Sequence, residues 1–138
     1  MNSHPDPCRG SIHPKAMEGL LYFNKKMYFE AHEALEDAWK LEGGPIRDLY
    51  KGILQAAVVY FHLTRQNYEG TVKMYDRSQK WLKGWPDVCR GIHIGQLRED
   101  LDATFAEVLR LGPEKLSSID PAGFKPITWN EMEEHKHE

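Results

Sequence analysis

LYKGILQAAVVYFHL, residues 49–63, is the stretch of sequence that decides the fold. Drawn as an α-helix at about 100° per residue, its apolar side chains point in nearly every direction. A helix that is apolar all round is a buried one, so the segment predicts the central helix of a bundle. Val58 and Val59 are typical of strands, but the length of the run and its lack of alternation favour a helix.

Helical periodicity continues on both sides of this segment. The central helix is expected from Pro45 to about Arg65, after the stop signal Gly43-Gly44. Asn67 is a good N-cap for the next helix, and Gly112-Pro113 ends the last one. The other helices are expected at residues 14–24, 28–41, 68–83 and 94–111. Because no strand signal is found, the sequence predicts an all-α fold, a single-domain bundle of about five helices.

The two ends of the chain lack this periodicity. We expect residues 1–13 to form a flexible leader and residues 14–111 to form the helical bundle domain. Residues 112–138 carry three prolines and a charged end, and we expect them to be an extended tail that packs through Phe124 or Trp129.

Composition restricts the classes of function. The 138 residues are 41% hydrophobic and 28% charged, with a net charge of −3, so there is no basic stripe for a nucleic acid. The longest apolar run is too short to span a bilayer, and the start has no apolar signal segment. Cys8 and Cys89 form no spaced pair, which indicates a reducing setting rather than a disulfide. These features together predict a cytoplasmic protein that binds neither nucleic acid nor membrane.

Two metal-capable side chains interrupt the apolar stripe of the helix over residues 28–41. His32 and Glu36 are four residues apart, in the middle of the stripe that Tyr28, Leu35 and Trp39 are expected to bury. A carboxylate in such a stripe must be paired, hydrogen-bonded or protonated. An imidazole nitrogen and a carboxylate oxygen that converge on one point suit a first-row divalent metal.

The central helix supplies a partner for this pair. Gln55 and His62 share one stripe, which faces the first pair if the two helices pack antiparallel across Gly43-Gly44. We therefore predict a site for a divalent metal ion of unassigned identity. Its ligands are His32, Glu36 and His62, its supporting residue is Gln55, and its walls are Trp39 and Tyr60. Such an ion would activate a water molecule, which makes a metal-dependent hydrolase the first hypothesis.

A structural interpretation of the same residues stays open. A buried histidine–glutamate pair can be a hydrogen-bond network that fixes helix register. In that case the protein is a non-enzymatic helical interaction module, with a small molecule, another protein or a second copy of the chain as its partner. The zinc-protease motif H-E-x-x-H is not met, because Glu36 stands where its second histidine is required.

Histidines near the two ends are weaker candidates. His4, Cys8 and His13 are capable of ligating a metal, but a leader without periodicity is the simpler interpretation. His135 and His137 are expected to be solvated tail residues.

The motif residues resemble a known family. The run YFEAHEALEDAW, residues 28–39, is similar to the signature H-x-x-x-E-x-x-W of the domain-of-unknown-function 309 family. The resemblance covers roughly residues 18–83 and includes Phe23-Asn24, Gly52-x-x-Gln55-x-Ala57, His62 and Asn67-x-x-Gly70. It implies a compact helical bundle of bacterial and archaeal cytoplasmic proteins and a metal role for His32 and Glu36. No established reaction comes with it.

Overall fold

The computed structural model describes residues 6–130, and its fold is all-α. Over these residues the chain forms five α-helices: α1 (Pro14–Asn24), α2 (Tyr28–Leu41), α3 (Arg47–Thr64), α4 (Tyr68–Leu82) and α5 (Ile94–Leu111). The predicted five-helix bundle is confirmed. Two short 3₁₀-helices follow, η1 (Pro113–Ser118) and η2 (Pro121–Gly123). No helix within residues 6–130 is both long enough and apolar enough to cross a membrane.

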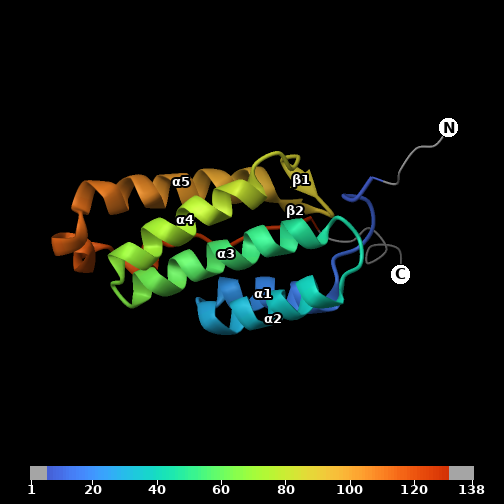
Figure 1. The fold of residues 1–138 in the computed structure, drawn as a ribbon, viewed down its shortest axis with the longest axis horizontal. Coiled ribbons are helices and arrows are strands. Elements are labelled where there is room, and N and C mark those ends of the chain that lie inside the picture. Colours follow the sequence, from blue (N-terminus) through green and yellow to red (C-terminus); the bar gives the residue numbers. More distant parts are fainter. Residues whose placement is uncertain (1–5, 131–138) are drawn as a thin grey trace.

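The central position of α3 is confirmed. In Figure 1, α3 crosses the middle of the molecule, with α1 and α2 on one side and α4 and α5 on the other. Nine of its residues are buried: Leu49, Tyr50, Gly52, Ile53, Ala56, Ala57, Val59, Tyr60 and Leu63. A Cβ atom added to Gly52 would lie 2.8 Å from Leu82 Cδ2. This glycine therefore lets α3 and α4 approach closely.

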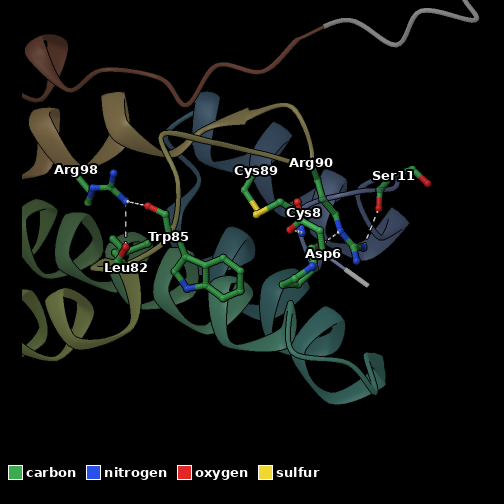
Figure 2. Close-up of a disulfide and its surroundings, with 9 residues drawn as sticks. Asp6, Cys8, Ser11, Leu82, Trp85, Cys89, Arg90 and Arg98 are labelled. Carbon is green, nitrogen blue, oxygen red and sulfur yellow. Dashed lines mark hydrogen bonds between the residues drawn. A yellow bond between two sulfur atoms is a disulfide. The ribbon is translucent and has the colours of Figure 1, made fainter. Parts of the chain in front are cut away.

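A small β-hairpin that the periodicity did not predict joins α4 to α5. Its strands are β1 (Val88–Cys89) and β2 (Ile92–His93), which pair antiparallel. Arg98 of α5 fixes the turn before the hairpin, because its Nη1 donates to the carbonyl oxygens of Leu82 (3.1 Å) and Trp85 (2.9 Å) (Figure 2).

The tail returns along the bundle. The Asn24 side chain donates to the Ile127 carbonyl oxygen and accepts from the Ile127 N–H, both at 2.8 Å. Phe124 is buried, as expected, and Trp129 forms a β-bridge with Ile92. His4, His135 and His137 lie outside the described residues.

The expectation for the cysteines is wrong, because Cys8 and Cys89 form a disulfide across 81 residues of sequence. The hairpin brings Cys89 over the start of the chain, a proximity that spacing along the sequence does not reveal. Arg90 holds the same segment: its N–H donates to the Cys8 carbonyl oxygen (2.9 Å), its Nε to that of Pro7 (2.8 Å) and its Nη1 to that of Ser11 (3.0 Å) (Figure 2). Disulfides persist in oxidising compartments, so cysteine usage no longer supports a cytoplasmic location.

Candidate functional site

The motif residues of α2 lie at the helix surface and not in its buried stripe. The Glu36 side chain is 41% exposed, and its Oε2 lies 3.9 Å from Lys40 Nζ. The His32 ring is half-buried beside Phe29, with 5.8 Å between ring centroids. The buried residues of α2 are Tyr28, Ala31, Ala34, Leu35 and Ala38. Small alanines, more than the large aromatic residues, thus mark the face that packs against the rest of the bundle.

The antiparallel register of α2 and α3 separates His62 from Glu36. The rings of Phe29 and Phe61 lie 5.7 Å apart. At the other end of the contact, Lys51 Nζ lies 5.1 Å from the ring centroid of Trp39. The two residue numbers of each pair add to 90, which places Glu36 opposite position 54. His62 is eight residues further along α3, about 12 Å along the helix axis at about 1.5 Å per residue.

His62 instead belongs to the turn between α3 and α4. Its Nδ1 lies 3.2 Å from Asn67 Nδ2, while Asn67 Oδ1 accepts from the N–H of Gly70 at 3.0 Å and caps α4. A Cβ atom on Gly70 would lie 2.7 Å from the same His62 nitrogen. Burial lowers the pKa of His62, which favours a neutral ring that can accept from the Asn67 amide.

The two other residues expected at the site face different surroundings. Tyr60 lies in the core, where its ring stacks on Tyr28 with 5.3 Å between centroids and its hydroxyl lies 3.3 Å from Thr104 Oγ1. Gln55 of α3 is half-buried, and its Oε1 is buried without a hydrogen-bond partner in the described part of the chain. Tyr60 therefore forms no wall beside Gln55.

The predicted ligand set is not assembled into one cluster. Between residues 6 and 130, no three histidine, cysteine, aspartate or glutamate side chains are grouped as a metal ion requires. His32 and Glu36 share one face of α2, whereas His62 lies beyond the register of that pair. The weaker candidates are also engaged elsewhere: Cys8 is in the disulfide, and His13 Nδ1 accepts from the N–H of Lys15 at 3.0 Å. Metal binding stays a prediction.

Cationic and aromatic side chains meet around Trp39 of α2. We call Trp39, Arg47, Lys51 and Trp81 the tryptophan–cation cluster. Arg47 Cζ lies 4.7 Å from the Trp39 ring centroid, and its Nε donates to the Trp39 carbonyl oxygen at 3.2 Å. Lys51 Nζ lies over both rings, 5.1 Å from Trp39 and 4.6 Å from Trp81. Helices α2, α3 and α4 thus contribute side chains to one half-buried surface. A cation over the face of a tryptophan ring is attracted by the ring quadrupole.

The cluster could have been found in part from the sequence. Arg47 and Lys51 are four residues apart on α3, and Lys51 is four residues before Gln55, so all three share one side of the helix. The participation of Trp81 depends on how α4 packs, which no local spacing reveals.

A similar contact between a cation and aromatic rings lies at the other end of the α2–α3 contact. Phe29 is 47% exposed and lies against Phe61, and Arg65 Cζ lies 5.1 Å from the Phe61 ring centroid. Among residues 6–130, none of Arg47, Lys51 and Arg65 forms an ion pair with a carboxylate. Each of these three cations lies over an aromatic ring, and within residues 6–130 their side chains donate only one hydrogen bond, from Arg47 Nε to the Trp39 carbonyl oxygen.

Comparisons with known proteins place part of this site in a family. The chain is similar to an uncharacterized protein of Aquifex aeolicus (strain VF5), with 27% identity over 86 residues, 62% of this chain and 26% of that protein. It is also similar to the uncharacterized protein YpuF of Bacillus subtilis (strain 168), with 30% identity over 102 residues, 70% of this chain and 59% of that protein. The chain thus spans less than two thirds of the length of either relative.

The family model itself covers most of α1, all of α2 and α3, and the first half of α4. Residues 17–74 match the domain of unknown function DUF309, a segment that includes Trp39, Arg47 and Lys51 but ends before Trp81. The resemblance expected from the sequence is therefore confirmed over residues 17–74, where the chain matches the model of the DUF309 family.

Proposed function

We propose that this protein is a non-enzymatic helical binding module that recognises an acidic segment of another protein through the tryptophan–cation cluster. The observation that carries the proposal is the position of Arg47 and Lys51. Both cations lie over tryptophan rings on a half-buried surface, and neither forms an ion pair with a carboxylate within residues 6–130.

The chemistry of these groups suits carboxylates. A guanidinium has five N–H donors, of which the Arg47 Nε–H is used on the Trp39 carbonyl oxygen. The remaining N–H groups of Arg47 can donate to the two oxygens of a carboxylate in the bidentate geometry that arginine favours. The rings of Trp39 and Trp81 add rigid apolar area, and tryptophan and arginine are enriched among the residues that dominate binding energy.

The arrangement of the motif residues favours this function over a metal-dependent hydrolase. Glu36 is directed to Lys40, and His62 is engaged by the turn that caps α4. The third residue of the motif, Trp39, meets Arg47 and Lys51 of α3.

The test is a titration with a defined acidic peptide. A blocked peptide of alternating glutamate and leucine is added to ¹⁵N-labelled protein, and a peptide with glutamine in place of glutamate serves as the charge control. We expect the indole N–H signals of Trp39 and Trp81 to shift with the acidic peptide, with an affinity that falls as salt is added. Equal binding of the glutamine peptide, or indole signals that do not move, would overturn the proposal.

Matched variants locate the binding. Arg47→Met and Lys51→Met keep apolar length and remove the charge, and together they should weaken the acidic peptide roughly tenfold, which corresponds to about 1.4 kcal/mol. Arg65→Met removes a cation of the same chemistry over Phe61 at the opposite end of the contact. It should leave the affinity within twofold of the wild type. If Arg65→Met alone abolishes binding, the tryptophan–cation cluster is not the site.

A further inference from the structure

A hollow of about 620 Å³ lies beside α4, on the side that faces α5. Its walls are half-buried apolar and aromatic side chains, Tyr68, Val72, Tyr75 and Phe105. The charged residues at its edge are Glu69, Lys73 and Asp76. Small-molecule sites in proteins have volumes of roughly 300–1,000 Å³ and combine apolar walls with a few polar groups. The hollow has the size and the lining of such a site.

Its aromatic wall is held in place before any ligand binds. The rings of Tyr75 and Phe105 are stacked, with centroids 3.8 Å apart and planes 7° from parallel. The Tyr75 hydroxyl donates to Asp102 Oδ1 at 2.7 Å. Both ring positions are therefore fixed by contacts between α4 and α5. A wall that needs no reordering reduces the entropic cost of binding.

The charges around the hollow favour a cation. Two carboxylates, Glu69 and Asp76, stand against one ammonium group, Lys73, and Asp102 adds a third carboxylate behind Tyr75. In the described part of the chain none of these carboxylates forms an ion pair. Aromatic faces attract cations as well, so the rings and the carboxylates act in the same direction.

The geometry points to a second binding site, in the hollow between α4 and Phe105, for a small molecule that joins a planar apolar body to a cationic amine. The apolar body would lie against Val72 and the aromatic rings, and the amine would lie toward Glu69 and Asp76. The site is independent of the tryptophan–cation cluster, because Val72 and Trp81 are nine residues apart. At about 100° per residue they are on opposite sides of α4.

Two probes with the same ring and opposite charge test the inference. Tryptamine carries an ammonium group and indole-3-acetate a carboxylate, and each is titrated into ¹⁵N-labelled full-length chain. Tryptamine should shift the amide signals of residues 68–76 and of Phe105, with an affinity at least about fivefold higher than that of indole-3-acetate. Equal affinities would overturn the choice of a cation, and shifts that avoid α4 and Phe105 would overturn the site.

Variants separate binding in the hollow from binding elsewhere on the surface. Val72→Phe fills the hollow and should weaken tryptamine roughly tenfold, which Val88→Phe, the same change at an exposed valine of β1, should not do. Glu69→Gln with Asp76→Asn should weaken tryptamine about fivefold and leave indole-3-acetate no weaker. A Val72→Phe protein that folds and binds tryptamine as the wild type does would contradict the proposal.

Discussion

Helix α4 meets its two neighbours in different ways. Toward α3 it packs closely, because Gly52 leaves room for Leu82, which is buried along with the small residues Thr71 and Ser78 of α4. Toward α5 it is held by the stacked rings of Tyr75 and Phe105, beside a hollow of about 620 Å³. Small residues let two helices approach until no space is left, whereas large rings act as spacers. One side of α4 is therefore suited to stability and the other to binding.

The largest expected effect on stability comes from removing the disulfide. The hairpin between α4 and α5 is linked to the start of the chain by Cys8–Cys89, a loop of 81 residues. Cys8→Ser with Cys89→Ser should lower the free energy of unfolding by about 4 kcal/mol, since the unfolded chain is no longer constrained. Urea denaturation measures the change, and reduced wild type is the control. An unchanged midpoint would mean that the disulfide adds nothing to stability.

A smaller effect is expected where α3 and α4 pack closely. Gly52→Val places a side chain where Leu82 Cδ2 would lie 2.8 Å from the new Cβ and the Trp81 carbonyl carbon 3.2 Å from it. The overpacking should lower the free energy of unfolding by about 2 kcal/mol in the same denaturation experiment.

Gly43→Val is the control for this change, because a Cβ atom at Gly43 meets no other atom within 4 Å. If both valine variants unfold at the same urea concentration, the close approach of α3 and α4 is not what stabilises this side of the bundle.

The smallest effect is expected on the open side of α4. Burial and the neighbouring Asp102 carboxylate raise the pKa of Tyr75 to about 12, from an ordinary value of 10.0. The protonated hydroxyl therefore stabilises the fold below pH 10, and this contribution is lost as the pH rises through 12. Ultraviolet titration of tyrosinate should show a component near pH 12 that is missing in Tyr75→Phe.

The same variant should lower the free energy of unfolding at neutral pH by no more than about 1 kcal/mol, because the bond to Asp102 is exposed. Phe105 keeps the stacked ring in either case. If Tyr75→Phe instead loses a component near pH 10, the pKa of Tyr75 is not raised.

The helices could be predicted because their signals are local. The all-round apolar pattern of residues 49–63 marks a buried helix whatever surrounds it, and Gly43-Gly44-Pro45 stops the helix before it. The buried face of α2 was predicted in part: Tyr28 and Leu35 are buried as expected, but Trp39 is only half-buried. Ala31 and Ala38, which allow close packing, complete this face.

The candidate site depended on relations that are not local. The distance between Glu36 and His62 depends on the register of α2 against α3, which the turn before Arg47 decides and the helical wheel does not contain. The contact of His62 with Asn67 at the α4 cap is local, since the two residues are five apart, but the sequence pattern did not distinguish it from a metal ligand. The disulfide and the position of Trp81 could not be predicted from the sequence, because both depend on the path of the chain in space.

The disulfide also makes the molecule a closed ring with a tail. Residues 8 to 89 form a covalent macrocycle that contains α1 to α4, while α5 and the segment after it are not part of this ring. A protease that cuts once between these cysteines leaves one covalent molecule, and a cut after Cys89 releases a fragment. Under a mechanical force applied before Cys8 and after Cys89, tension along the covalent chain passes through the sulfur–sulfur bond, so that the backbone between the two cysteines is not extended until the bond is reduced.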